Sequence, residues 1–301
     1  DLLREYQVRG MRVLGFEPAA EIAAIARGRS IPTESEFFTE KDAVRVAVGK
    51  TLVGRAKLVV ANNVFAHLAN LQDFMRAVDV FLADDGVFVF EVHDRRTLVE
   101  QGDVFSVYHE HVHYWAIFPV MKFFESFDMY VFDVQAIPTH NGSMRVFVQR
   151  HGGPHKRNND ALTTWLVDEL RLELFDKSTY AALGERVEQS RRQFQELFLS
   201  LIWTPLNAGG SSPRVVVLGC PAKLTTMAYH FGLKTSDVAY VVDDEPRKIG
   251  KLTPGLRWPI RSFAALAEDP PDICLLGAFN YVVALVERVK SMWGKRPLPI
   301  F

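Results

Sequence analysis

The run Lys57-Leu58-Val59-Val60-Ala61 is apolar after its first residue and ends in Asn62-Asn63. A continuous apolar run of this length is typical of a strand that is buried on both faces of a sheet. Residues 70–82 follow with the spacing of a helix, and residues 87–92 form a second apolar run, Val-Phe-Val-Phe-Glu-Val. Two buried strands joined by a helix predict a parallel sheet and therefore an α/β fold.

The residues upstream of this unit continue the same pattern. Residues 1–10 have the spacing of an amphipathic helix, and residues 11–16 predict a short strand. Pro18 is well placed to start a helix that runs to about Ala26. Residues 41–53 predict a further helix before the central strand.

A hairpin is expected to close the first domain. Residues 118–127 predict a helix, and residues 129–137 and 144–149 predict the two strands of the hairpin. Gly152-Gly153-Pro154 and the polar residues after it mark a boundary. We therefore expect a Rossmann-like domain over residues 1–151.

The second half of the chain predicts a smaller domain of the same class. Residues 160–203 are helical in spacing, with a break near Lys177 to Tyr180, so we expect a helical linker over residues 152–206. Three short apolar runs then predict parallel strands at residues 214–219, 238–244 and 272–277. These strands indicate a second, smaller Rossmann-like α/β domain over residues 207–301.

The composition restricts the class of function. Of 301 residues, 48% are hydrophobic and 24% charged, and the formal net charge of -1 provides no field that attracts nucleic acid or an anionic membrane. No apolar run approaches the roughly 20 residues that span a bilayer. Cys220 and Cys274 lie in apolar runs, so we expect buried, reduced thiols in a cytoplasmic protein. The oligomeric state is left open.

Polar side chains follow the ends of the predicted parallel strands. Glu17 follows the first strand, and Asn62, Asn63 and His67 follow the central one. Ligands of open α/β sheets bind outside the carboxyl ends of the strands, where a carboxylate can accept both hydroxyls of an adenosine ribose. A solvated glutamate at a helix start, an asparagine turn and a structural histidine remain alternatives.

The segment Tyr108-His109-Glu110-His111 gathers a phenol, a carboxylate and two imidazoles, and His113 follows closely. Imidazole takes or gives a proton near neutral pH, and a carboxylate can hold the ring in one tautomer. The segment therefore favours general-base chemistry. It also allows an idle aromatic-rich loop, or a metal site in which His109, His111 and His113 share one face of a strand.

A phosphate site is predicted after the first strand of the second domain. Gly219-Cys220-Pro221-Ala222-Lys223 opens a helix, whose free N–H groups and Lys223 can hold a phosphate. The segment lacks the second glycine of a dinucleotide-binding fingerprint. An NAD(P)-dependent oxidoreductase that uses Gly219 and Asp243 is the alternative from another reaction class, and the missing glycine counts against it. Asn280 follows the third predicted strand.

Five segments taken together resemble the nucleotide-sugar C-methyltransferases that act on 4-keto-deoxyhexoses. They occur in the family's order along nearly the whole chain: Phe16-Glu17-Pro18-Ala19, Ala61-Asn62-Asn63-Val64-Phe65-Ala66-His67, Tyr108-His109-Glu110-His111, Pro138-Thr139-His140-Asn141-Gly142-Ser143-Met144-Arg145 and Cys220-Pro221-Ala222-Lys223. The resemblance implies a zinc-binding N-terminal domain, a central methyltransferase-type domain that binds S-adenosylmethionine, and a C-terminal Rossmann-like domain that helps hold the nucleotide sugar.

This sequence supplies only the last two of those domains. We expect the zinc site, and the family's first strand and glycine-rich loop, to lie upstream in a longer protein or to be lost in a naturally shortened one. Two further departures are Leu224, where the family carries glycine, and His93-Asp94-Arg95, where its pattern is more apolar. A protein that binds sugar nucleotides without turnover is the non-enzymatic alternative.

The resemblance also implies roles for individual residues. An enolate that attacks a methyl donor needs a base at the carbon and a hydrogen-bond donor at the oxygen. His111 is implied as the base, and Tyr108 as its hydrogen-bond partner. Glu110 is implied to position His111 or to grip the sugar, and His67 to contact the sugar or its keto oxygen. The implied cofactor residues are Glu17, Pro18, Phe38 and Asn62. The implied substrate residues are Asn63, His140, Ser143, Arg145, Lys223 and Asn280.

Overall fold

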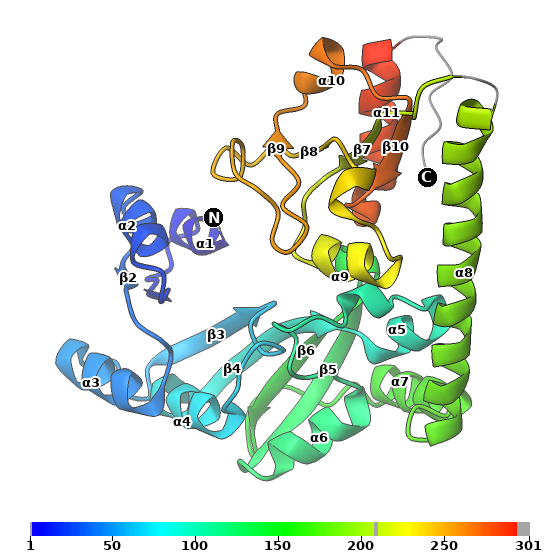
Figure 1. Cartoon of the computed structure of the whole chain (residues 1–301). Helices are drawn as coiled ribbons and strands as arrows, with labels where there is room; N and C mark the ends of the chain where they lie inside the picture. Colours follow the sequence, from blue (N-terminus) through cyan, green and yellow to red (C-terminus); the bar gives the residue numbers. More distant parts are fainter. Residues whose placement is uncertain (1, 208–209, 294–301) are drawn as a thin grey trace. The chain divides into compact units, whose positions relative to one another are not determined.

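The computed structural model describes residues 2–207 and 210–293, without the side chains of residues 140, 204–207 and 293. Its contacts divide the chain into two compact units (Figure 1). Unit 1 consists of Asp1–Arg95 and Val112–Arg171, and unit 2 consists of Arg96–His111 and Leu172–Phe301. Both units carry parallel strands and helices, so the mixed α/β class expected from the sequence is confirmed.

Unit 1 is built on a four-stranded sheet in the order β3-β4-β6-β5. Strands β3 and β4 are parallel, and β6 runs antiparallel to both of its neighbours. The predicted central strands and the closing hairpin are therefore confirmed. The strands are β3 (Ala56–Asn62), β4 (Leu82–His93), β5 (Met129–Ile137) and β6 (Ser143–Arg150).

A separate parallel pair, β1 (Gly15–Phe16) with β2 (Thr33–Glu34), is shorter than the strand expected at residues 11–16. Of the strand expected at residues 11–16, only Gly15 and Phe16 pair with another strand. The helices that accompany these strands are α1 (Leu2–Val8), α2 (Ala20–Gly28), α3 (Glu40–Lys50), α4 (Leu71–Phe81), α6 (Ile117–Glu125) and α7 (Asn159–Arg171), with the short η2 (Thr139–Asn141).

The core of unit 1 centres on Phe65, which is fully buried. Its ring centroid lies 4.6 Å from that of Phe90 and 5.2 Å from that of Trp115. Leu162 and Trp165 of α7 belong to the same core, so the first part of the expected linker packs on unit 1. The strand β4 begins earlier than expected because Gly86 lets it approach β3: a Cβ at Gly86 would lie 2.6 Å from the Ala56 oxygen.

Unit 2 contains a parallel sheet in the order β10-β7-β8-β9. Strand β7 comes first in the sequence but lies between β8 and β10, so the winding direction reverses at β7 and β10. The strands are β7 (Val215–Leu218), β8 (Tyr240–Val242), β9 (Ile260–Arg261) and β10 (Ile273–Leu276). The helices are α8 (Lys177–Asn207), α9 (Lys223–His230), α10 (Ala265–Glu268) and α11 (Val282–Trp293), with η1 (Val104–Ser106), η3 (Thr235–Asp237) and η4 (Phe279–Tyr281); α5 (Arg95–Gln101) begins at the unit boundary.

The break between α7 and α8 falls at residues 172–176, slightly earlier than expected. Glu173 has the left-handed φ of 50°, which ends α7. The hydroxyls of Thr179 and Tyr180 then donate hydrogen bonds to the carbonyls of Glu173 and Leu174. In the described ranges, no helix has the length and hydropathy that crossing a bilayer requires.

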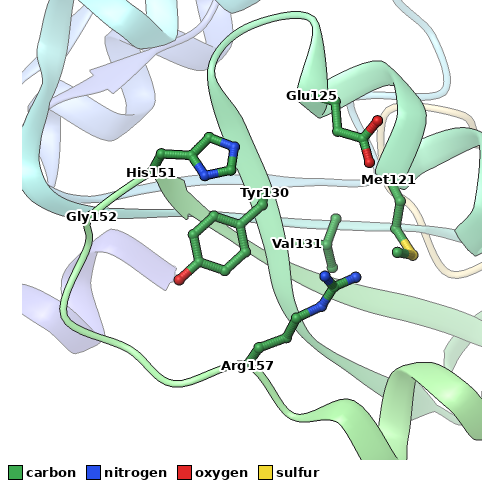
Figure 2. A pocket seen from close by; sticks show the side chains of 7 residues that line it. All are labelled: Met121, Glu125, Tyr130, Val131, His151, Gly152 and Arg157. Carbon is green, nitrogen blue, oxygen red and sulfur yellow. The ribbon is translucent and has the colours of Figure 1, made fainter.

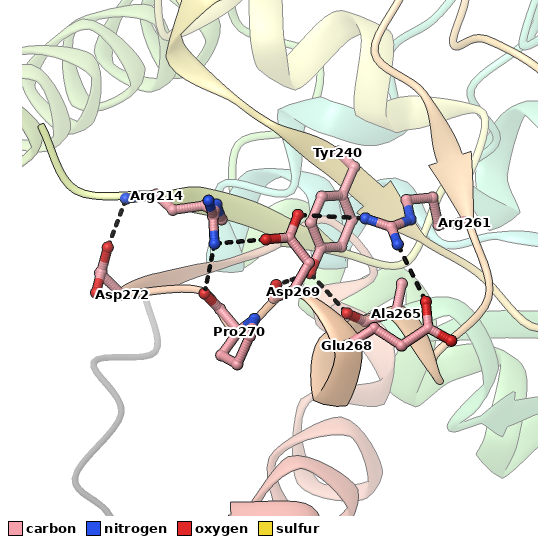
Figure 3. A network of polar contacts seen from close by, with 8 residues as sticks. All are labelled: Arg214, Tyr240, Arg261, Ala265, Glu268, Asp269, Pro270 and Asp272. Carbon is pink, nitrogen blue, oxygen red and sulfur yellow. Dashed lines mark hydrogen bonds and ion pairs between the residues drawn. The ribbon is translucent and has the colours of Figure 1, made fainter.

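An ion-pair network joins the segment before β10 to the other strands of unit 2 (Figure 3). Asp269 pairs with Arg214 and with Arg261, at 2.5 and 3.3 Å. The Tyr240 hydroxyl donates to the Asp269 carbonyl at 2.6 Å. Burial, followed by the charge of Asp269, raises the pKa of Tyr240 to about 12. The network therefore holds a neutral phenol inside the sheet.

Candidate functional site

Three polar residues form a row across the sheet of unit 1. Asn62 ends β3 and pairs with Glu91 of β4, and Glu91 pairs with Arg145 of β6. Directly paired residues of neighbouring strands present their side chains on the same face of a sheet. Asn62, Glu91 and Arg145 therefore lie side by side near the carboxyl end of β3.

Glu91 and Arg145 form an ion pair in this row. Arg145 Nε donates to Glu91 Oε1 at 2.6 Å, and only 5% of Glu91 is exposed. A carboxylate at this depth needs a charged partner, because burial strongly disfavours an isolated charge. Glu91 was not identified from the sequence, although a single acid within the apolar run 87–92 is the signal that points to it. Arg145, expected at the substrate, is here the partner of Glu91.

Asn62 has an unsatisfied acceptor. Its Oδ1 atom is buried and has no hydrogen-bond partner among the described residues. Such an atom costs free energy until a donor reaches it, so it favours a ligand with an N–H or O–H group. Asn63 beside it takes a left-handed φ of 53°, which asparagine tolerates, and its N–H donates to the Glu91 carbonyl. His67 is half-buried in the turn that follows.

The residues expected to bind the cofactor near β1 already have structural contacts. Glu17 directly follows β1, and its Oε1 accepts a hydrogen bond from the Ala19 N–H at 2.8 Å, at the start of α2. Pro18 is exposed. Phe38 packs against the rings of Phe16 and Phe74, at centroid distances of 4.8 and 5.2 Å. Phe38 thus contributes to an aromatic cluster of the core.

Two more predicted substrate residues lie where β5 connects to β6: His140 in η2 and Ser143 at the start of β6. Ser143 is 2% exposed, and its hydroxyl donates to the Thr139 carbonyl at 3.0 Å. This hydroxyl therefore closes the turn. The side chain of His140 lies outside the described residues.

The segment at residues 104–111 holds the imidazole of His111 in one tautomer. His111 Nδ1 lies 2.8 Å from the Ser106 carbonyl oxygen, and Nε2 lies 3.1 Å from the Tyr108 hydroxyl. A carbonyl oxygen only accepts, so Nδ1 carries the proton. Nε2 of the neutral ring then accepts from the Tyr108 hydroxyl. The lone pair of His111 is therefore on Nε2, as a base requires.

The acidic neighbour of His111 makes a different contact. Glu110 Oε1 lies 3.9 Å from Nε2 of His109, and both side chains are mostly exposed. Within the described ranges, no three His, Cys, Asp or Glu residues are grouped so that they could hold a metal ion. The interpretation of His109, His111 and His113 as metal ligands therefore has no support.

In unit 2, the structure brings Lys223 and Asn280 together. Lys223 Nζ donates to Asn280 Oδ1 at 2.8 Å and lies 3.7 Å from the centroid of the Phe279 ring. Lys223 follows β7 and Asn280 follows β10, so both lie where the strand order reverses, the usual ligand position in such sheets. Phe279 was missed from the sequence. Its position next to Asn280, a predicted site residue, is the sequence feature that could have pointed to it.

Burial lowers the pKa of Lys223, and the charge of Asp103 opposes that shift. An ammonium group in this setting is stabilised by a further anion. Leu224, which stands where the family carries glycine, is 5% exposed and packs in the core beneath α9. Its side chain therefore leaves the helix start accessible.

The features expected of a nicotinamide site are used within the fold. Asp243 Oδ2 accepts from the Cys220 N–H at 2.8 Å and from Lys248 Nζ at 3.1 Å. Gly219 has φ 85°, and a Cβ there would lie 2.4 Å from the Cβ of Ala278. The glycine thus admits a neighbouring loop of the protein, which counts against the dinucleotide interpretation.

A separate cavity of about 360 Å³ opens on unit 1 (Figure 2). Tyr130 on its wall pairs with Gln149, which pairs with Val87, so the cavity lies at the other end of the β4–β6 pairing from Glu91. It contains none of the predicted site residues. Its lining consists of Met121, Glu125, Tyr130, Val131, His151, Gly152 and Arg157.

Comparison with known proteins identifies the family. Residues 138–297 match the C-methyltransferase C-terminal domain, and residues 1–132 match a methyltransferase domain. The chain belongs to the C-methyltransferase family. It is 30% identical over 289 residues to C-methyltransferase NovU of Streptomyces niveus, an alignment that covers 96% of this chain. The aligned part is 66% of NovU, so this C-methyltransferase chain spans about two thirds of its relative's length.

Proposed function

We propose that this protein transfers a methyl group from S-adenosylmethionine to a carbon next to the ketone of a nucleotide-linked 4-keto-deoxy sugar. The observation that carries the proposal is the tautomer of His111, whose Nδ1 is held by the Ser106 carbonyl at 2.8 Å. This leaves Nε2 as the basic atom. A positioned base of this kind is worth ~10²- to 10⁴-fold in rate.

The polar residues at the strand ends of unit 1 fit S-adenosylmethionine. The buried Asn62 Oδ1 needs a donor, which the adenine amino group provides. The Glu17 carboxylate follows β1, where it can accept from ribose hydroxyls. When bound, the cofactor supplies an electrophilic methyl group. Asn62 and Glu17 serve to hold and orient it.

His111 and Tyr108 carry out the proton transfer in this proposal. The hydrogen on the carbon beside a ketone is acidic because the resulting charge spreads onto the carbonyl oxygen. His111 Nε2 takes this proton, and the bond from Nδ1–H to the Ser106 carbonyl stabilises the imidazolium. In the structure the Tyr108 hydroxyl donates to the same Nε2 lone pair, so it turns away when the substrate proton reaches Nε2, and its oxygen then accepts from the imidazolium. His67 and Asn63 are the proposed contacts to the sugar.

The diphosphate of the nucleotide sugar is assigned to Lys223 and Asn280. The Lys223 ammonium donates to the Asn280 amide oxygen and lies over the Phe279 ring, both uncharged, and the charge of Asp103 only partly offsets its burial. A diphosphate at this place adds the anion that a half-buried ammonium favours. The reversal of strand order at β7 and β10 supports a ligand at the same place.

The proposal is tested with His111→Asn in the full-length protein, using a labelled methyl donor and a nucleotide 4-keto-deoxy sugar. We expect turnover to fall by ~10²- to 10⁴-fold, while calorimetry shows unchanged binding of S-adenosylhomocysteine. Turnover near the wild-type value would show that His111 is not the base. A wild-type protein that binds sugar nucleotides but neither binds S-adenosylhomocysteine nor transfers methyl would support a non-catalytic binding protein instead.

A further inference from the structure

The segment that carries Tyr108 and His111 is anchored in unit 2 by one aromatic side chain. The ring centroid of Phe105 lies 5.3 Å from that of Phe231, 5.7 Å from that of His230 and 6.1 Å from that of Phe279. Phe105 lies in η1, one residue before Ser106, whose carbonyl holds the His111 ring. The position of Phe105 therefore sets the position of the carbonyl that orients His111.

The Phe279 ring is shared between this anchor and the proposed diphosphate site. Lys223 Nζ lies 3.7 Å from the centroid of Phe279, and Phe105 contacts the same ring. An ammonium over an aromatic ring is held by the ring's quadrupole. An anion bound at Lys223 competes with the Phe279 ring for the ammonium. Binding of the anion therefore acts directly on Phe279, against which Phe105 packs.

A second connection joins Lys223 to the same segment through charge. Asp103 is 6% exposed, and its Oδ2 accepts from the Ser106 hydroxyl at 2.9 Å. The Asp103 carboxylate also interacts electrostatically with the Lys223 ammonium. Asp103 therefore links Lys223 to the residue whose carbonyl holds the His111 Nδ1 proton.

We infer that Phe105 and Asp103 are positioning residues that couple diphosphate binding at Lys223 to the placement of the His111 imidazole. The inference rests on the proposed function and adds to it a way in which the enzyme favours substrates that carry a diphosphate. Part of the binding free energy of the diphosphate, which is remote from the reacting carbon, is used to orient the base. The nucleotide portion of the substrate then raises kcat as well as affinity.

The coupling is tested with Phe105→Leu and Asp103→Asn in the full-length protein. We expect kcat to fall on the order of 10- to 100-fold, because a small displacement of a base is costly, while the Kd for a free nucleoside diphosphate does not rise, since none of its binding free energy is then used to orient the base. The loss should be much smaller when Lys223→Gln is already present, since the coupling is then broken.

Phe263→Leu is the matched control. Phe263 is also a phenylalanine of unit 2 with a cation over its ring, Arg288 at 3.8 Å, but it packs in the other core cluster of that unit. This variant should lower the Tm and leave kcat unchanged. If Phe105→Leu lowers kcat no more than Phe263→Leu does, the coupling is overturned while the proposed function stands.

A binding measurement decides the coupling without any turnover. Titration of wild-type protein with a nucleoside diphosphate should shift the ring NMR resonances of His111, and Phe105→Leu should abolish the shift while binding persists. Wild-type protein that binds the diphosphate with no shift at His111 overturns the inference. A wild-type protein that shows the shift but transfers no methyl group supports the coupling and contradicts the proposed function.

Discussion

The roles of individual side chains depend on which of their atoms are already bonded. In the proposed function His111 is the base, because the Ser106 carbonyl accepts the Nδ1 proton and the lone pair lies on Nε2, whose partner is a neutral hydroxyl that can turn away. Arg145 has the opposite status, since Glu91 already binds its guanidinium. Judged by residue type alone, His111 and Arg145 would be equally good candidates for the site.

Tyr240 provides a prediction at the same scale. Its pKa is raised to about 12 from an ordinary 10.0, so the folded protein keeps the phenolic proton after the unfolded chain has lost it. This contribution to stability is complete below about pH 10 and is lost as the pH rises toward 12. Denaturant unfolding at a series of pH values should show this loss in the wild type and a shallower decline in Tyr240→Phe.

Tyr281→Phe is the control, because Tyr281 is 65% exposed. It should follow the wild-type curve. Identical slopes for wild type and Tyr240→Phe between about pH 10 and 12 would show that the phenol of Tyr240 does not carry the effect.

Contacts between helices decide where some of them begin. The N-cap residue of α6 is Ala116, which has no side-chain acceptor. Glu169 of α7 supplies the acceptor instead: its carboxylate receives the N–H groups of Ile117 and Phe118. A carboxylate at a helix N-terminus also interacts favourably with the helix dipole. The start of α6 is therefore set by a residue about fifty positions later in the chain.

We expect Glu169→Ala to lower the free energy of unfolding by about 1–3 kcal/mol, since it removes a charged acceptor from two backbone N–H groups. Denaturant unfolding measures the change, and hydrogen exchange should show faster exchange at the first turn of α6. Glu125→Ala, in an exposed glutamate of α6, should change stability by less than about 0.5 kcal/mol. Equal effects of the two variants would remove the capping role from Glu169.

Each unit has a hydrophobic core of its own. Phe65 lies at the centre of the larger cluster in unit 1, and Trp258, 1% exposed, lies in a cluster of unit 2 that includes β7 and α9. Separate cores allow the two units to lose structure independently.

Phe65→Ala and Trp258→Ala should each lower the free energy of unfolding by about 3–5 kcal/mol. The first should destabilise unit 1 and the second unit 2. Hydrogen exchange followed by mass spectrometry should show lost protection in β3, β4 and β6 for the first variant, and in β7, β8 and β10 for the second. Loss of protection across both units from either substitution would show that the chain unfolds as one cooperative body.

The sequence alone determined the α/β class and the placement of several candidate residues. Apolar runs located β3, β4, β7 and β10, because burial on both faces of a parallel sheet demands such runs. Lys223 and Asn280 could each be placed at a strand end from the sequence, but only the strand order, in which β10 lies beside β7, brings them together. Leu224 shows the limit of this reasoning, because only the packing of α9 revealed that its side chain points into the core.

Only the tertiary structure decided which residues became partners. The grouping of residues 96–111 with unit 2, the pairing of Glu91 with Arg145, and the capping of α6 by Glu169 all depend on contacts across long stretches of chain. Hydrophobic periodicity records how deeply a residue is buried and which way its strand or helix faces. It carries no information on the identity of a distant neighbour, and a hydrogen bond or ion pair depends on that identity.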